Sequence, residues 1–135
     1  MKKIILGILL LCFAGCSDDD SLACKKTIVD NTTYSNIVND EFTITDVTLV
    51  SNCIKITIEY GGGCGEAIVD LIAEEDIFES SPVQRNIQIS FSDNDDCEAL
   101  IKKEYHFSVT PLRVENENTV QLNIENYPEP ILFEY

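Results

Sequence analysis

The 135-residue sequence has few basic residues: nine lysines and arginines stand against twenty-four aspartates and glutamates. So acidic a chain repels nucleic acid and anionic lipid head groups, because proteins bind both through lysine and arginine. There is one histidine, His106, and the cysteines are widely spaced, which argues against a zinc site. The longest apolar run, residues 4–14, has eleven residues. A spanning helix needs about twenty, so this run is too short to cross a membrane.

The N-terminus has the order of a secretory signal. Lys2 and Lys3 precede the apolar run, and Gly15 and Cys16 follow it in front of a polar, acidic stretch. The residues Phe-Ala-Gly-Cys at 13–16 resemble the lipobox of bacterial lipoproteins, with phenylalanine where an aliphatic residue is usual. The resemblance implies cleavage before Cys16, acyl chains such as palmitate on that cysteine and permanent membrane anchoring. The alternative is an ordinary secretory peptide that ends near a cysteine.

An acidic run follows the proposed lipidation site. Ser17, Asp18, Asp19 and Asp20 resemble the surface-export signal of Bacteroidota lipoproteins, which implies an outer-membrane protein that faces the cell exterior. The alternative is a solvated acidic linker. The tripeptide around Ser21 also resembles the O-glycosylation site of the same bacteria.

Charge and length define the expected organisation. Without residues 1–15 the chain has seven basic and twenty-four acidic residues, a formal charge of −17. The remaining 120 residues suffice for one domain with its own core. Residues 16–40 are polar and without periodicity, so we expect an acidic tether. Residues 41–135 then form the folded domain.

Four cysteines remain after export and lipidation: Cys24, Cys53, Cys64 and Cys97. An oxidising compartment favours disulfides over free thiols or metal ligands, and three pairings are formally possible. A strand starting at Cys53 would carry the chain about 25 Å before Cys64, whereas bridged Cα atoms lie within about 7 Å. We expect Cys64 to pair with Cys97, both in loops after strands, and Cys24 to pair with Cys53.

From residue 41 onward the sequence shows strand periodicity. Apolar and polar residues alternate in residues 54–60, 87–91, 101–109 and 119–124, with shorter stretches at 42–49, 67–73 and 131–135. The alternation changes phase near Asp46, which predicts a β-bulge. Seven short strands with frequent turns predict an all-β, antiparallel, immunoglobulin-like β-sandwich, although the tryptophan typical of true immunoglobulin cores is missing. Residues 69–78 and 97–104 could be partly helical.

Several motifs look like those of a group of small Bacteroidota lipoproteins to which no activity is assigned. They are Cys-Ile-Lys-Ile-Thr-Ile at 53–58, Tyr-Gly-Gly-Gly-Cys at 60–64, Ser-Pro-Val-Gln at 81–84 and Asp-Cys-Glu-Ala-Leu-Ile at 96–101. The resemblance supports the fold. In that group a histidine often follows the Gly-Gly-Cys loop, but here Glu66 and Ala67 occupy the stretch, so no role of that histidine carries over.

One cluster could carry metal chemistry. Asp93, Asp95, Asp96 and Glu98 supply the oxygens that calcium prefers, but their spacing does not match an EF-hand. The alternatives are a calcium site and an ordinary acidic turn. His106 lies on the polar side of its strand, where we expect it to be exposed.

No catalytic constellation is recognisable, and no cofactor is expected. The leading hypothesis is a non-catalytic module of the outer membrane that binds a glycan, a peptide or a partner protein. Its alternatives are an inhibitor or protective protein and a small hydrolase, and all three hypotheses rest on address and fold analogy.

Overall fold

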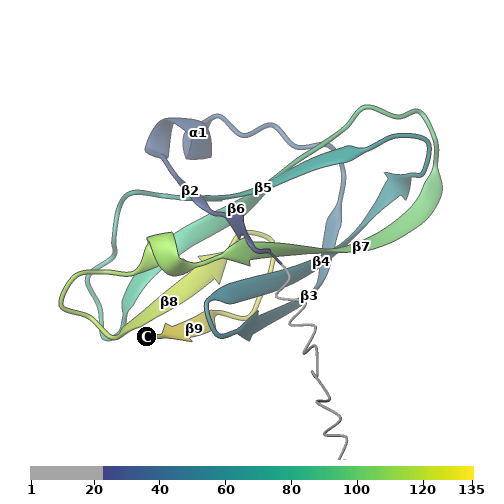
Figure 1. Ribbon diagram of the computed structural model, residues 1–135. Helices are drawn as coiled ribbons and strands as arrows, with labels where there is room; N and C mark the ends of the chain where they lie inside the picture. Colours follow the sequence, from purple (N-terminus) through teal and green to yellow (C-terminus); the bar gives the residue numbers. More distant parts are fainter. Residues whose placement is uncertain (1–22) are drawn as a thin grey trace, which may run out of the picture.

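The computed structural model describes residues 23–135, which form two packed β-sheets (Figure 1). The strands in chain order are β1 (Lys25–Lys26), β2 (Ile28–Val29), β3 (Thr43–Val50), β4 (Cys53–Gly62), β5 (Ala67–Ala73), β6 (Val83–Asp93), β7 (Ala99–Ser108), β8 (Thr119–Ile124) and β9 (Ile131–Glu134). A short helix, α1 (Asn31–Ser35), precedes β3, and a 3-10 helix, η1 (Thr110–Leu112), follows β7. The order in sheet A is β1-β7-β4-β3, and in sheet B it is β2-β5-β6-β8-β9. The predicted all-β sandwich is confirmed, with seven of these strands in residues 41–135.

The core lies between the two sheets. Ile54, Ile56 and Ile58 of β4 are fully buried and belong to one hydrophobic core cluster with Ile87 and Ile89 of β6. These residues alternate with half-buried polar residues, as the strand period requires. The β-branched side chains that favour a pleated backbone therefore also supply the apolar layer that holds the sheets together.

The strand pairing differs in part from the expected antiparallel arrangement. Four pairs of strands are antiparallel, but β1 pairs with β7, β2 with β5 and β6 with β8 in parallel. A parallel pair needs a long crossover connection, and the chain between β6 and β8 passes through β7 of the other sheet. Both sheets are consequently mixed.

The expected tether also differs from the structure where the structure describes it. Between Cys24 and Asp40 the chain adds β1 to sheet A and β2 to sheet B, and α1 lies near β5. The Lys25 ammonium lies 2.6 Å from Asp70 on β5, so the segment also bridges the two sheets. Strands of two residues have no detectable period, which is why sequence patterning missed them.

The two ambiguous segments are largely extended. Residues 69–73 belong to β5 and residues 99–104 belong to β7. Ladder pairing with β6 and β4 overrides the helix propensity of their Ala, Leu, Glu and Lys residues. The predicted β-bulge is confirmed, because the register of β3 against β4 shifts between Ile44 and Asp46.

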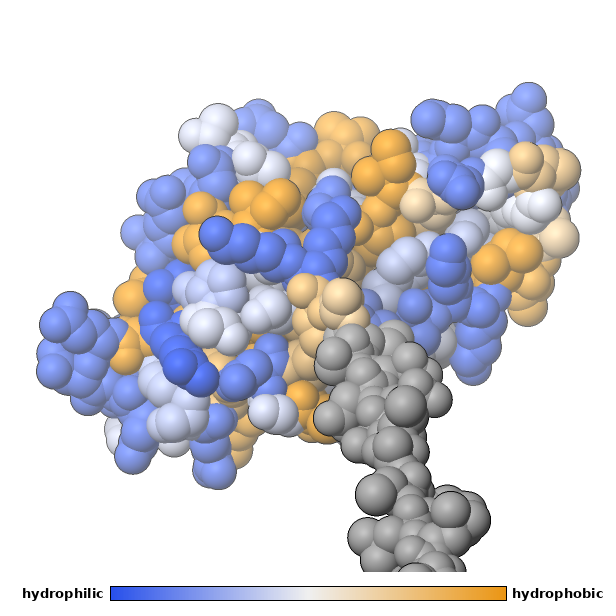
Figure 2. Space-filling model, viewed as in Figure 1, coloured by the Kyte–Doolittle hydropathy of each residue, from blue (hydrophilic) through white to orange (hydrophobic). Residues whose placement is uncertain are grey.

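Figure 2 shows hydrophilic side chains over much of the visible surface, with hydrophobic patches between them. Exposed large apolar side chains include Val38, Ile68 and Leu100. No helix within residues 23–135 is long and apolar enough to span a membrane.

Candidate functional site

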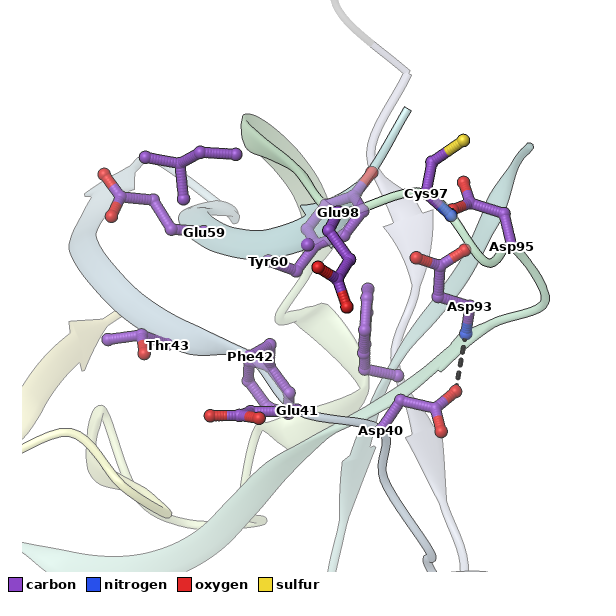
Figure 3. Close-up of a pocket in the computed structure, with 13 residues that line it drawn as sticks. Asp40, Glu41, Phe42, Thr43, Glu59, Tyr60, Asp93, Asp95, Cys97 and Glu98 are labelled. Carbon is purple, nitrogen blue, oxygen red and sulfur yellow. Dashed lines mark hydrogen bonds between the residues drawn. The ribbon is translucent and has the colours of Figure 1, made fainter. Parts of the chain in front are cut away.

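An open cleft of about 460 Å³ lies where β3 starts and β4 and β6 end (Figure 3). It is lined by Asp40, Glu41, Phe42, Thr43, Glu59, Tyr60, Gly61, Phe91, Asp93, Asp95, Cys97, Glu98 and Leu100. We call it the acidic cleft, because six of these thirteen residues are aspartate or glutamate. Figure 3 shows the carboxylates of Asp93 and Glu98 directed into the same space.

The cleft forms because, among the described residues, β4 and β6 each lack a neighbouring strand on one side at this end of the sandwich. Strand β3 begins at Thr43, opposite Glu59, so within the described chain no strand continues this ladder along the last residues of β4. On β6 the ladder with β8 ends at Ile87. Asn39 and Asp40 cover the β6 edge beyond that point, and we call these two residues the edge clasp.

The edge clasp replaces a missing strand. The Asn39 side-chain amide donates to the Ile89 carbonyl at 2.9 Å and accepts from the Phe91 N–H at 2.7 Å. The Asp40 N–H donates to the Phe91 carbonyl at 3.2 Å, and its carboxylate accepts from the Asp93 N–H at 2.8 Å. The clasp thereby pairs backbone groups of β6 that no neighbouring strand within residues 23–135 pairs. After the clasp, the chain continues directly into residues that line the acidic cleft.

The floor of the acidic cleft is aromatic. The Phe91 ring centroid lies 5.3 Å from Phe42 and 4.8 Å from Tyr60. Phe91 and Tyr60 are buried, Phe42 is half-buried, and Glu41 and Glu98 at the rim are exposed. An apolar floor with negative ring faces beneath a rim of carboxylates attracts cations and repels anions.

Both predicted disulfides are present. Cys64 pairs with Cys97 beside the acidic cleft and Cys24 pairs with Cys53, with Cα separations of 5.7 and 6.0 Å. The second bridge fastens the chain ahead of β1 to the start of β4. The turn before Cys64 contains Gly63 with φ of +115°, a conformation open to glycine and strained for other residues.

Asp95 organises the loop around the Cys64–Cys97 bridge. Its carboxylate accepts the N–H groups of Gly63, Cys64 and Gly65 through Oδ2 and that of Cys97 through Oδ1, at 2.9–3.1 Å. Desolvation raises the pKa of this carboxyl, but the four backbone hydrogen bonds outweigh it and hold the pKa below its usual value. Asp95 is therefore a loop-forming acceptor, with little capacity left for a metal.

The other calcium candidates do not form a metal site together with Asp95. Asp96 is exposed, Glu98 lies on the cleft rim, and the backbone of Asp93 is held by Asp40. Within residues 23–135, no three His, Cys, Asp or Glu side chains are grouped to hold a metal ion. Hydrogen bonds to backbone N–H groups thus hold the turn around Asp93 and Asp95.

Two buried polar atoms are Asp93 Oδ1, of a residue that lines the acidic cleft, and the Tyr105 hydroxyl. Burial, Tyr60 and the negative charge of Asp93 raise the pKa of Tyr105 above its usual value. The Tyr105 hydroxyl is therefore protonated at neutral pH.

The expectation of an exposed His106 is wrong. Its side chain is only 10% exposed, and Nε2 lies 2.6 Å from the Glu104 carboxylate. The polar side of β7 is covered at this point, which strand alternation alone could not show. His106 lies outside the acidic cleft.

Six predicted site residues lie outside the described residues: Cys16, Ser17, Asp18, Asp19, Asp20 and Ser21. Conversely, sequence reasoning missed Asp40, Glu41 and Glu59 as parts of one site. Their common signal is only acidity, and with twenty-four acidic residues that signal selects no position.

The described residues thus form an all-β sandwich with an acidic cleft at one end of its two sheets. No protein-family model and no curated protein matches the chain. A protein of unknown function, DUF1344, from Bacteroides vulgatus has a similar fold, with a TM-score of 0.57, 14% identity and coverage of 83% of this chain and 56% of its own. A NigD-like immunity protein from Bacteroides caccae has a TM-score of 0.61, 10% identity and coverage of 81% and 58%. At these identities the likeness concerns the fold alone, and the chain spans less than two thirds of either protein.

Proposed function

We propose that the protein is a lipid-anchored, non-catalytic binding module on the outer face of the outer membrane, and that its acidic cleft holds a cationic segment of a partner protein. The observation that carries the proposal is the cleft itself: an aromatic floor beneath a rim of carboxylates, with no basic residue in its lining. A lysine or arginine side chain matches both features, since its apolar stem packs on rings and its charge faces the carboxylates.

The charge of the whole chain supports the same partner. After signal removal the module would have a formal net charge of −17. Such a charge attracts cationic proteins over several Ångströms and speeds their encounter with the negative surface. The contact is salt-sensitive, because three of the six acidic residues that line the cleft are exposed.

The test uses the purified full-length protein and a fluorescent lysine-rich peptide containing one tyrosine, with a glutamate-rich peptide of the same length as the negative probe. Glu41→Gln/Glu98→Gln removes two exposed rim charges without touching a hydrogen bond found in the structure. We expect affinity for the lysine-rich peptide to fall roughly threefold to tenfold, the range for two exposed ion pairs.

The matched control is Glu115→Gln/Glu117→Gln, which makes the same charge change at exposed positions between η1 and β8. It should bind like the unmodified protein. Equal weakening by the two double variants means that the peptide senses only net charge, and the cleft then has no special role.

Anchoring is tested separately through Cys16. Cys16→Ser should release the protein from the membrane fraction, and protease added to intact cells should degrade the unmodified protein. Retention of Cys16→Ser in the membrane contradicts the lipid anchor, and protection from protease contradicts surface exposure.

A protective role is the second candidate, favoured by the immunity protein of similar fold. The acidic cleft would then hold a cationic segment of a toxic protein. Deletion of the gene should sensitise cells to culture supernatant of competing strains, and the Glu41→Gln/Glu98→Gln variant should restore less protection than the Glu115→Gln/Glu117→Gln control.

A further inference from the structure

The outer face of sheet B carries a compact block of amide side chains, which we call the amide platform. It consists of Gln84 and Asn86 on β6 and Gln121 and Asn123 on β8. The parallel register of the two strands sets Gln84 beside Gln121 and Asn86 beside Asn123. All four side chains are half-buried, so they form a continuous surface rather than separate solvated chains.

The platform is ordered by its own hydrogen bonds. Gln84 Oε1 accepts from Gln121 at 3.1 Å and from Asn123 at 3.0 Å, and Gln121 also donates to Asn123 at 2.9 Å. At the margins, Gln84 donates to the Ser80 hydroxyl and Asn86 to the Glu74 carboxylate, both at 3.1 Å. A side chain already held in place loses little entropy when a ligand binds, so the platform is preorganised.

The network leaves capacity for a ligand. Each amide nitrogen has two hydrogens, and in the described hydrogen bonds Gln84 and Asn86 each use one of them. The amide oxygens likewise hold two lone pairs each, and Asn86 and Asn123 each accept one bond here. The platform thus offers donors and acceptors side by side.

Two adjoining hollows extend across the platform. Their volumes are about 230 and 390 Å³, and both are lined by Asn86 and Asn123. Tyr34 lines the first hollow and Phe78, 49% exposed, lines the second. Burial, Glu74 and Glu125 raise the pKa of Tyr34 to about 12, so its hydroxyl is protonated at neutral pH. An aromatic side chain therefore stands at each end of the amide row.

Charge narrows the class of ligand. The charged residues that line the two hollows are Glu79 and Glu125, both exposed, and neither hollow is lined by a basic residue. Acidic margins repel an anionic ligand. A cation offers only donors and would leave the amide hydrogens unmatched.

We propose that the amide platform binds a neutral oligosaccharide. Sugar hydroxyls are donors and acceptors at once and match paired amides, and the apolar face of a sugar ring packs on Phe78 or Tyr34. The site shares no residue with the acidic cleft, so it adds a second ligand class to the proposed binding module.

The test is native electrophoresis of the full-length protein through gels that contain a neutral β-glucan, mannan, galactan or xylan, with carboxymethylated glucan as the anionic probe. At least one neutral polymer should retard the protein, and the anionic probe should not. No retardation by any neutral polymer, or stronger retardation by the anionic one, overturns the proposal. A neutral asparagine- and serine-rich peptide that competes as well as the polysaccharide also overturns it.

Asn86→Ala/Asn123→Ala should weaken the affinity roughly tenfold, the effect of losing two neutral hydrogen bonds. Phe78→Ala, at an exposed position, should weaken it too and covers the case in which the double variant fails to fold. The control Thr45→Ala/Thr48→Ala removes exposed hydroxyls from β3 of the other sheet and should leave retardation unchanged. Unchanged retardation of both platform variants overturns the proposal.

The cleft variant Glu41→Gln/Glu98→Gln separates the two proposals. It should bind the lysine-rich peptide more weakly and keep its retardation by the polysaccharide. The platform variants should keep their affinity for the peptide and be retarded less by the polysaccharide. If the cleft variant loses polysaccharide binding as well, the sugar does not bind at the platform alone and the assignment fails.

Discussion

At the scale of single residues, Asp95 shows how one carboxylate can determine a loop. Its four backbone hydrogen bonds join the glycine-rich turn before Cys64 to the segment that carries Cys97. The carboxylate accepts all four hydrogen bonds only while it is ionised, because a protonated carboxyl oxygen becomes a donor. The loop and its disulfide therefore depend on the charge of this side chain.

Asp95→Asn should lower the melting temperature at pH 7, because an amide nitrogen would face backbone N–H groups. The pKa of Asp95 is below its ordinary value of 3.8, so its stabilisation is complete above about that pH and is lost as pH falls through the lower folded-state pKa. The difference from the unmodified protein should thus narrow in strongly acidic buffer. Asp96→Asn, the same change at an exposed neighbour, is the control. Equal melting of Asp95→Asn and the unmodified protein at pH 7 contradicts this role.

Arg85 is a buried charge in the core face of β6, where it is only 7% exposed. Nη1 donates to the Glu74 carbonyl at 3.0 Å, but Nε has no hydrogen-bond partner in the described structure, and burial lowers the pKa of the guanidinium. Arg85→Met should therefore raise the free energy of unfolding by about 1 kcal/mol, as buried charges replaced by apolar residues often do. Urea denaturation measures the change.

Arg113→Met is the matched comparison and should have the opposite sign. Arg113 is exposed and lies over the rings of Phe133 and Tyr135 at 5.9 and 5.1 Å, so its loss should cost about 0.5–1 kcal/mol. Destabilisation of Arg85→Met by more than Arg113→Met would show that the buried guanidinium is a net stabiliser.

At the scale of elements, a strand can be predicted from sequence only if it is long enough to show the alternation of apolar and polar residues. Strand β4 was readable from Ile54, Ile56 and Ile58, because a period of two extends over eight residues. The edge clasp was not readable, since Asn39 acts through hydrogen bonds to β6, some fifty positions further along the chain. A polar residue in an irregular stretch looks the same whether it meets water or replaces a strand.

The clasp itself is testable. Asn39→Ala should lower the free energy of unfolding by about 1–2 kcal/mol, because it leaves the Ile89 carbonyl and the Phe91 N–H without their partner. Asn36→Ala, which removes one exposed hydrogen bond to the Thr32 carbonyl, should cost less than about 0.5 kcal/mol. Equal losses in the two variants mean that the clasp does not stabilise β6.

At the scale of the whole molecule, the sandwich was predictable and the acidic cleft was not. The fold class follows from the number of segments with alternating apolar and polar residues, and this count does not require knowing which strands pair. The cleft is assembled from the start of β3, the ends of β4 and β6 and the start of β7. Its location depends on where ladders stop, and that depends on pairing between segments far apart in sequence. The disulfide pairing was predictable because the length of β4 excludes a Cys53–Cys64 bridge, and because Cys64 and Cys97 both lie in loops that follow strands.

The charge of the molecule makes a last prediction. The formal charge of the chain is −15, and its excess negative charges repel one another over a Debye length of about 30 Å at 0.01 M salt and about 10 Å at 0.1 M. Two described ion pairs, Lys25–Asp70 and Lys102–Glu59, would be weakened by salt, but the repulsions outnumber them. Added sodium chloride should therefore raise the melting temperature by several degrees, where 1 kcal/mol corresponds to roughly 4–8 °C in a small domain.

Calcium distinguishes this screening from specific binding. Calcium and magnesium chloride at equal ionic strength screen the same repulsions, so they should raise the melting temperature equally unless calcium has its own site. We expect equal shifts, because the oxygens of Asp95 already accept backbone N–H groups and no three His, Cys, Asp or Glu side chains within residues 23–135 are grouped to hold a metal ion. A larger shift with calcium, abolished by Asp93→Asn but not by the control Glu115→Gln, would show that the acidic turn rearranges to bind the ion.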